Sequence, residues 1–311
     1  MTHITTRDGS TLSRFAFGTM QFGGKADAEA SAAMFHDARA AGINHFDTAV
    51  GYTDGRAETI LGGLVGDAPT DLLIASKVAY TGGAGAANIM AQFDRIRSQL
   101  QMDAIDLLYL HRFDPDTPLE ESFETLAALQ ADGAIRYIGV SNFAAWQIMK
   151  AQVVANSFGT RIDAVQPMYN LVKRQAEVEI FPVCQDQEIT IFPYSPLGGG
   201  LLTGKYSQGA GDGRLSHDDR YHARYGQDWM HKTATDLANL AAELDVAPAT
   251  LAVAWAAHHP AQPHPIISAK SSEQLAPSLA AMDFAMDDAL YDRIAAMGRT
   301  PPPATDRLEE A

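Results

Sequence analysis

Short apolar runs alternate with longer amphipathic stretches along most of the chain. Eight runs have the near-continuous apolar character that is typical of parallel strands covered on both faces. They lie at residues 14–18, 43–49, 71–78, 105–112, 135–142, 162–167, 189–195 and 264–270. Strands that alternate with helices in this way predict a parallel sheet with helical crossovers.

The stretches between these runs carry helical periodicity or helix-end residues. Helices are expected at residues 28–41, 57–65, 86–100, 119–131, 144–155, 174–187, 233–244 and 249–258. Asn142 is the expected N-cap of the fifth helix. Eight β/α units predict an α/β fold, a (β/α)8 TIM barrel, as a single domain over residues 1–311. A doubly wound sheet is disfavoured, because no strand is followed by G-x-G-x-x-G.

Three segments lie outside this alternation. Asp8-Gly9 favours a tight turn and predicts an N-terminal β-hairpin over the barrel floor. Residues 207–232 are polar and Gly-rich, and predict a long loop on the C-terminal face that either closes over the barrel mouth or lies on the surface. Its candidate substrate contacts are His217, His222, Tyr225 and Trp229. Residues 300–311 contain three prolines and predict a flexible tail.

The charge balance excludes some classes of partner. With 23 Lys and Arg against 38 Asp and Glu, the formal charge is −15, which argues against nucleic acid and against anionic membrane surfaces. No apolar run reaches the roughly 20 residues that span a bilayer, and the polar N-terminus lacks a signal-peptide core. The single cysteine, Cys184, cannot form an internal disulfide. We therefore expect a cytoplasmic protein.

Polar and ionisable side chains close seven of the eight predicted strands. They are Asp47, Lys77, His111, Ser141 with Asn142, Gln166, Ser195, and Ser268 with Lys270. Each alone is explained by a solvated strand end. In a parallel barrel, however, the C-terminal strand ends meet on one face, where barrel enzymes place their chemistry. The recurrence therefore predicts a shared site.

Lys77 allows two interpretations. As a nucleophile it would form a Schiff base, as in an aldolase. As a charge held by Asp47, it would stabilise the phenolate of Tyr52, five residues after Asp47, and lower the Tyr52 pKa from its ordinary value near 10. Tyr52 would then donate a proton to a developing alkoxide, while His111 bonds the substrate oxygen. One Asp and one His without Cys make a poor metal site, so no metal is expected.

Carbonyl reduction by such a set needs a bound hydride carrier, because these side chains supply no electrons. Ser141, Asn142 and Gln166 offer donors and acceptors for a carboxamide. Tyr194 offers a flat face on which a nicotinamide ring would stack.

Several sequence stretches resemble signatures of the aldo-keto reductase family. They are FGTMQFGG (17–24), GINHFDTAVGYTDGRAETILG (42–62), LLYLHRFD (107–114), GAIRYIGVSN (133–142), QPMYNL (166–171) and YSPLGGGLLTGKY (194–206). The resemblance implies a (β/α)8 barrel that reduces aldehydes or ketones with NAD(P)H. It places the catalytic tetrad on Asp47, Tyr52, Lys77 and His111.

The resemblance also implies cofactor contacts. They fall on Thr19, Met20, Asp47, Ser141, Asn142, Gln166, Tyr194, Ser195, Leu197, Gly198, Ser268, Lys270 and Gln274. Lys270 stands where the family often has Arg, and Pro277 with Ser278 replaces its usual Glu-Asn pair. Lysine holds a 2′-phosphate as a point charge, so NADPH is favoured and NADH remains open.

Three alternatives remain beside carbonyl reduction of a small molecule. The same chemistry in reverse gives an NAD(P)-dependent sugar or alcohol dehydrogenase. The resemblance extends to the potassium-channel β-subunit branch, which implies a cofactor-binding regulatory subunit with little turnover. The third alternative is the Lys77 aldolase, against which the position of Tyr52 counts. The sequence predicts neither the physiological substrate nor the oligomeric state.

Overall fold

Eight parallel strands form one sheet in the order β7-β6-β5-β4-β3-β2-β1-β8. They are β1 (Ala16–Gly18), β2 (His45–Asp47), β3 (Leu73–Val78), β4 (Ile105–Leu110), β5 (Ile135–Ser141), β6 (Ala164–Gln166), β7 (Thr190–Ile191) and β8 (Ile266–Ile267). This computed structural model describes residues 4–66, 69–206, 218–307 and 309. The N–H groups of His264 and Ile266 donate to the carbonyls of Ile191 and Pro193 at 2.8 Å, so the sheet curls until β8 meets β7.

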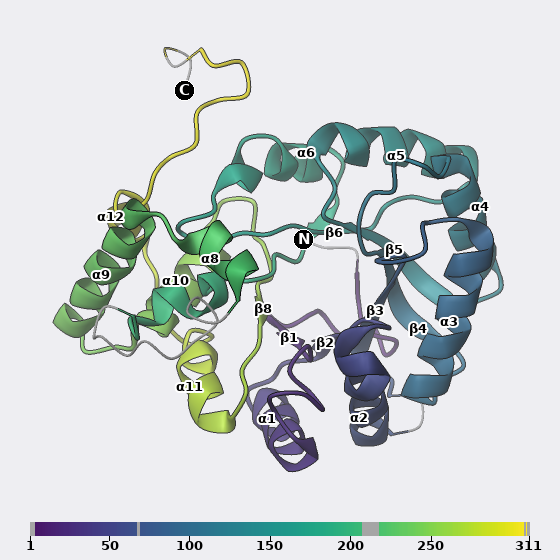
Figure 1. The fold of residues 1–311 in the computed structure, drawn as a ribbon, viewed down its shortest axis with the longest axis horizontal. Helices are drawn as coiled ribbons and strands as arrows, with labels where there is room; N and C mark the ends of the chain where they lie inside the picture. Colours follow the sequence, from purple (N-terminus) through teal and green to yellow (C-terminus); the bar gives the residue numbers. More distant parts are fainter. Residues whose placement is uncertain (1–3, 67–68, 207–217, 308, 310–311) are drawn as a thin grey trace.

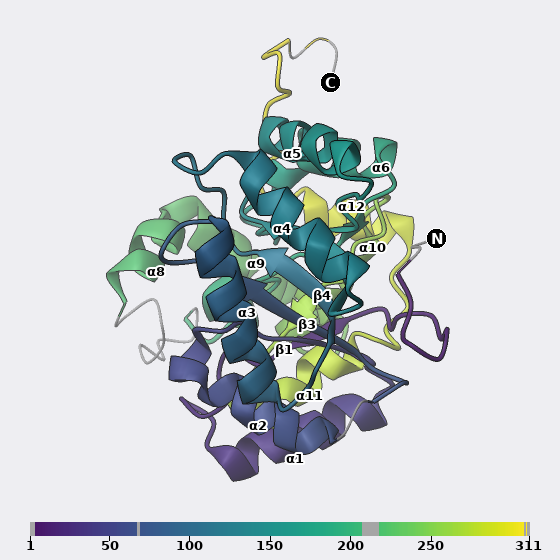
Figure 2. The same ribbon diagram turned by 90° about the vertical axis from the view of Figure 1, so that its right-hand side faces the viewer.

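Helices cover the outside of the strands (Figure 1 and Figure 2). They are α1 (Ala28–Ala40), α2 (Arg56–Val65), α3 (Ala86–Leu100), α4 (Leu119–Ala131), α5 (Ala145–Ser157), α6 (Ile180–Asp186), α8 (Asp219–Tyr225), α9 (Asp228–Glu243), α10 (Pro248–His258), α11 (Ser272–Ala280) and α12 (Asp288–Ala295). The short 3-10 helices are η1 (Tyr52–Gly55), η2 (Gln175–Glu177) and η3 (Gly198–Thr203). The predicted (β/α)8 barrel is confirmed.

The helices bury the faces that their periodicity predicts. In α3 the buried residues are Ile89, Phe93, Ile96 and Leu100, spaced at three and four positions. Helix α2 approaches α3 so closely that a Cβ on Gly62 would lie 2.3 Å from the Leu100 carbonyl oxygen. Only glycine allows this contact between the two helices.

The predicted N-terminal hairpin is present and lies at the end of the barrel where the strands begin. Thr5 and Thr11 form its antiparallel bridge. Ile4 and Leu12 are buried with side chains from inside the barrel, including Leu73 and Leu107. The hairpin thus closes the barrel floor and leaves the opposite mouth for chemistry.

Two local expectations for helices were wrong. Helix α5 begins at Ala145 rather than after Asn142, because the Gln147 side chain accepts the N–H of Ala144. Asn142 instead adopts a φ of 58°. The single helix expected at residues 174–187 is split into η2 and α6.

The chain between η3 and α9 is more helical than its polarity suggested. Within the expected loop at 207–232, the structure has α8 and the first turns of α9, while residues 207–217 lie outside the described part. Helices α11 and α12 were not predicted, although capping residues mark both starts. The side chains of Ser271 and Asp287 accept N–H groups of Gln274 and Leu290, respectively.

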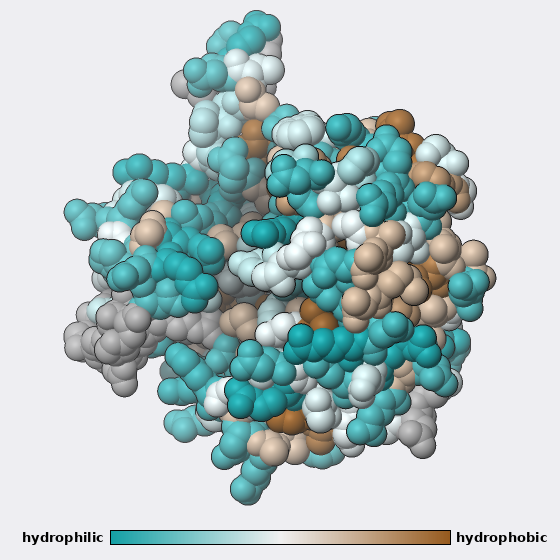
Figure 3. Space-filling view, turned by 45° about the vertical axis from the view of Figure 1, so that its right-hand side comes forward, coloured by the Kyte–Doolittle hydropathy of each residue, from teal (hydrophilic) through white to brown (hydrophobic). Residues whose placement is uncertain are grey.

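The surface is mostly hydrophilic on the face shown in Figure 3, with small separate apolar patches. No single helix among the described residues has the length and apolarity to cross a bilayer. Helices α9 and α10 meet that test only together, with a 104° bend between them. Both helices contribute buried side chains to the core.

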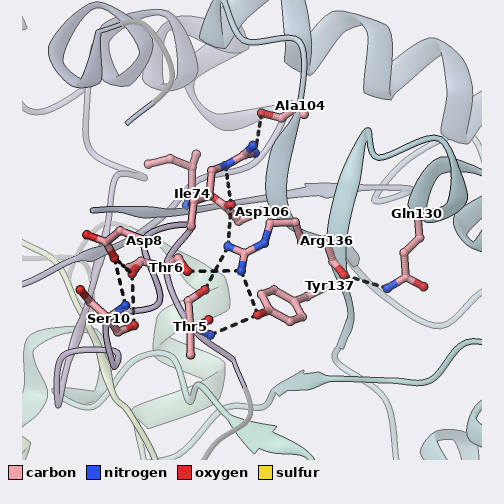
Figure 4. A network of polar contacts seen from close by, with 11 residues as sticks. Thr5, Thr6, Asp8, Ser10, Ile74, Ala104, Asp106, Gln130, Arg136 and Tyr137 are labelled. Carbon is pink, nitrogen blue, oxygen red and sulfur yellow. Dashed lines mark hydrogen bonds and ion pairs between the residues drawn. The ribbon is translucent and has the colours of Figure 1, made fainter. Parts of the chain in front are cut away.

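A buried carboxylate ties the hairpin to the strand starts (Figure 4). Asp106 is 1% exposed and accepts bonds from Arg7 Nε at 2.9 Å and Arg136 Nη1 at 3.2 Å. Its second oxygen accepts the Ile74 N–H at 2.9 Å. Arg136 also donates to the carbonyl of Thr5 at 3.1 Å. One side chain thus joins β3, β4, β5 and the hairpin.

We predict that Asp106→Ala lowers the free energy of unfolding by about 2–4 kcal/mol, because it leaves the Ile74 N–H and the two guanidinium groups without their shared acceptor. Urea unfolding measures the change. The fully exposed Asp103 on the same segment is the control, and Asp103→Ala should cost less than about 0.5 kcal/mol. Equal losses in the two variants would contradict a structural function of the floor network.

Because His45 is buried, we predict that the fold loses stability in acid. His45 is 1% exposed, both ring nitrogens lack hydrogen-bond partners among the described residues, and burial lowers its pKa to about 3. Between about pH 6.5 and 3, His45 is therefore protonated in the unfolded state and neutral in the folded state. The free energy of unfolding falls as the pH falls through that window. His45→Leu should flatten this decline, measured by urea unfolding from pH 7 to 4, whereas His36→Leu at an exposed position should leave it unchanged.

Candidate active site

The predicted strand-end side chains converge on one face of the barrel. Asp47 ends β2, and Lys77 is the second-last residue of β3. Ser141 and Gln166 end β5 and β6 and are paired in register. His111 follows β4 directly. Parallel register therefore brings these side chains to the C-terminal mouth, as the sequence predicted.

Asp47 and Lys77 form a buried ion pair at the centre of this face. Lys77 Nζ lies 2.5 Å from Asp47 Oδ1 and donates to the Thr48 carbonyl at 2.6 Å. The exposed fractions of Lys77 and Asp47 are 0% and 3%. Gln166 Nε2 donates to the other oxygen of Asp47 at 2.8 Å. Burial opposes the lysine charge, but Asp47 and Tyr52 together outweigh it, so the Lys77 pKa is raised.

Tyr52 reaches the pair from a turn above the barrel. In η1, Thr53 and Asp54 adopt φ values of 49° and 59°, which fold the loop back, and Thr53 Oγ1 donates to the Phe22 carbonyl at 2.7 Å. Lys77 Nζ lies 5.1 Å from the centre of the Tyr52 ring. Burial raises the Tyr52 pKa, and the opposing charge and hydrogen bonding of Lys77 lower it only in part. The direction is opposite to the sequence-based expectation, because desolvation of the phenolate dominates.

His111 stands beside Tyr52 with its ring nearly perpendicular, at 6.0 Å between centres and 77°. Tyr80 packs on its other side at 4.9 Å. Burial lowers the His111 pKa to about 3, helped by the positive charges of Lys77 and Arg112. The imidazole is therefore neutral at physiological pH and carries one N–H donor.

The predicted carboxamide and stacking residues are hydrogen-bonded to one another. Ser141 Oγ donates to the Gln166 carbonyl at 2.9 Å, and Asn142 Nδ2 donates to Ser141 Oγ at 3.1 Å. The Tyr194 hydroxyl donates to Asn142 Oδ1 at 2.7 Å. Asn142 also donates to the His111 carbonyl at 2.9 Å, which joins this group to the tetrad.

The segment after β7 turns sharply. Ser195 has a φ of 60°, and the three glycines from Gly198 to Gly200 have φ values between 57° and 98°. Leu197 is half-buried at the start of η3. A Cβ on Gly200 would lie 3.2 Å from Lys205 Nζ, so this ammonium covers a backbone turn of the kind that binds anions.

The remaining predicted cofactor contacts divide into two places. Thr19 donates to the Asp47 carbonyl through its N–H at 2.9 Å, and Met20 is 38% exposed beside it. Ser268, Lys270 and Gln274 lie around the start of α11, where the Lys270 N–H donates to Gln274 Oε1 at 2.9 Å. Among the described residues, no hydrogen bond joins this second group to the tetrad.

Two buried hydroxyls suit a phosphate at the start of α11. Ser268 Oγ and Ser272 Oγ are buried and have no hydrogen-bond partner in the described part of the chain. Lys270 is exposed beside them. Donors without acceptors next to a lysine fit the anionic end of a dinucleotide. Within the described ranges, no group of His, Cys, Asp or Glu is arranged to hold a metal ion.

Sequence reasoning missed several residues at this site. Tyr109 lies two positions before His111 on the same strand face, a spacing that could have revealed it. Glu58 is fully buried on α2, hydrogen-bonded to Ser76 beside Lys77, and burial raises its pKa to about 7. Electrostatic repulsion from Tyr221 of α8 contributes to the raised pKa of Tyr52.

Helix α8 occupies part of the segment at 207–232, for which the sequence predicts a loop. A Cβ on Gly199 would lie 2.6 Å from the Tyr221 ring, so α8 packs on η3. Of the candidate contacts, Tyr225 is buried and receives a hydrogen bond from Asn170 at 3.3 Å. Trp229 packs against Arg299, whose guanidinium carbon lies 4.8 Å from the ring centre. His217 is outside the described residues.

The sequence matches the model of the aldo/keto reductase family over residues 14–299. It is 37% identical over 203 residues to human aflatoxin B1 aldehyde reductase member 2, covering 63% of this chain and 56% of that protein. It therefore spans little more than half of that relative. It is 30% identical to a probable voltage-gated potassium channel subunit beta of rice (Oryza sativa subsp. japonica), covering 96% and 97% of the two chains. Identity to the Bacillus subtilis oxidoreductase YrpG is 30%, covering 90% of each chain.

The family match covers both the barrel and the strand-end residues described above. This chain belongs to the aldo/keto reductase family.

Proposed function

We propose that the protein reduces aldehydes or ketones to alcohols with NAD(P)H, with Tyr52 as the proton donor. The observation that carries this proposal is the buried Lys77 ammonium, bonded to Asp47 at 2.5 Å and lying 5.1 Å from the centre of the Tyr52 ring. A phenol beside a fixed cation is suited to release a proton to a developing alkoxide.

The protonation states at neutral pH suit this direction. Burial raises the Tyr52 pKa, so the phenol retains the proton that it must donate. The Lys77 charge then stabilises the phenolate as the proton leaves. His111 is neutral, since its pKa is about 3, and its N–H orients the carbonyl oxygen without competing as an acid. A bound nicotinamide cofactor would supply the hydride for the carbonyl carbon.

The remaining residues would hold the dinucleotide along the mouth. Ser141, Asn142 and Gln166 would bind the carboxamide, and the Tyr194 ring would support the nicotinamide. The turn at Ser195, Leu197 and Gly198 would follow the pyrophosphate, with Thr19 and Met20 opposite. Ser268, Lys270 and Gln274 would bind the adenosine phosphate. The unpartnered hydroxyls at the start of α11 support NADPH over NADH, because a 2′-phosphate would accept their hydrogen bonds.

A second candidate is a cofactor-binding regulatory subunit. It is favoured by the rice relative, a probable voltage-gated potassium channel subunit beta that aligns with 96% of this chain. Tight cofactor binding without turnover would favour it. Comparing the initial rates of carbonyl reduction and of alcohol oxidation distinguishes a reductase from a dehydrogenase. A Lys77 aldolase is disfavoured, because its ammonium is bonded to Asp47 and its pKa is raised.

We predict that Tyr52→Phe lowers kcat by about 10²–10⁴-fold, since the proton donor is lost while the ring remains. The NADPH dissociation constant, measured by quenching of protein fluorescence, should stay within about threefold of the parent, because none of the proposed cofactor contacts involves this hydroxyl. Tyr80→Phe is the control: this ring also packs on His111, but it is 52% exposed and is expected to keep its turnover. Normal turnover of Tyr52→Phe would remove Tyr52 from the mechanism.

We further predict that Lys270→Met weakens NADPH binding about tenfold and leaves NADH binding nearly unchanged, because only NADPH carries the 2′-phosphate that this charge would meet. Fluorescence titration with both cofactors measures the ratio. Lys150→Met, at an exposed position on α5, is the matched loss of charge. Equal weakening for both cofactors would place the 2′-phosphate elsewhere.

A further inference from the structure

Three residues on consecutive strands face one another inside the barrel. The register pairs Lys77 of β3 with Tyr109 of β4, and Tyr109 with Gly139 of β5. A Cβ on Gly139 would lie 2.3 Å and 2.4 Å from two carbons of the Tyr109 ring. The ring therefore lies across the space that the missing side chain leaves, and Tyr109 is fully buried there.

The Lys77 ammonium lies between two aromatic rings. Its nitrogen is 5.1 Å from the centre of the Tyr52 ring and 5.9 Å from the centre of the Tyr109 ring. Both distances are within the range in which a ring face attracts a cation, and the attraction is strongest where water is excluded. Tyr109 thus contacts the ammonium from inside the barrel, while Tyr52 contacts it at the mouth.

The Tyr109 hydroxyl is buried and makes no hydrogen bond within the described residues. Burial and the nearby charge of Asp47 raise the Tyr109 pKa well above its ordinary value, so the phenol remains protonated. A buried donor without a partner is costly, so the placement of a tyrosine here calls for a function.

We propose that Tyr109 is a positioning residue of the catalytic site: its ring holds the Lys77 ammonium in place. The inference rests on the proposed function, because Lys77 would act on proton donation by Tyr52. Tyr109 contacts neither substrate nor cofactor in this account.

Other titratable groups also act on Lys77 and must be held constant in a test. They are Asp47 and His45 of β2, Tyr52 of η1, Glu58 of α2, and His111 after β4. Substitutions at position 109 that keep the volume leave all of these in place. The ring can therefore be tested without creating a cavity.

Tyr109→Phe keeps the ring and removes a hydroxyl that makes no hydrogen bond within the described residues. It is therefore the reference for a series that changes the ring alone.

A series of phenylalanine analogues with one to three ring fluorines at position 109 tests the ring. Fluorination weakens the negative ring face with little change in size. We expect kcat for carbonyl reduction to fall stepwise with unchanged KM. The high-pH limb of the kcat profile should move to lower pH, because a less stabilised ammonium gives up its proton sooner. A flat series overturns the ring assignment, since a purely structural residue would not follow the fluorine count.

The two failures are distinguishable. Absence of carbonyl reduction in the unmodified protein would refute the proposed function. Normal reduction in the unmodified protein together with a flat fluorine series would refute the inference about Tyr109 alone.

Discussion

The ion pair between Lys77 and Asp47 is the interaction on which the site depends. Two opposite charges with exposed fractions of 0% and 3% are costly to desolvate unless their remaining hydrogen-bonding atoms are also paired. The barrel meets this need with two further partners: the Thr48 carbonyl accepts from the ammonium, and the Gln166 amide donates to the second carboxylate oxygen. The partners come from β2, β3 and β6, so the pair exists only when the sheet has curled. Folding and assembly of the chemical site are therefore one event.

Burial sets the protonation states of the neighbours as well as the strength of the pair. The same exclusion of water raises the pKa of Tyr52 and lowers that of His111 to about 3. The charge of Lys77 alone would lower the pKa of the Tyr52 phenol, but desolvation of the phenolate outweighs this effect. The site thus presents a protonated phenol, a charged lysine and a neutral imidazole together. Each of these states is the one that proton donation to a carbonyl oxygen needs.

The sequence predicted the elements that depend on local pattern and missed those that depend on packing. All eight strands fell within the predicted runs, and α3 and α4 matched at both ends, because periodicity and strand-end polarity are local signals. The split at 174–187 and the helix α8 depend on what they pack against. Tyr109 was overlooked because its importance comes from Gly139, thirty positions away, which only the sheet register places beside it.

Near α11, two residues that depart from the family pattern pack against a neighbouring helix. Pro277 and Ser278, which replace the usual Glu-Asn pair, face the neighbouring helix: the Pro277 carbonyl accepts the Thr250 hydroxyl at 2.7 Å, and Ser278 is 1% exposed. These positions serve helix packing and offer little to a ligand. Recognition of the adenosine phosphate would then fall to Lys270 and the unpartnered hydroxyls of Ser268 and Ser272. Such a site would recognise phosphate charge more than the adenine ring, and the choice between NADPH and NADH would then depend on a single exposed lysine and two serines.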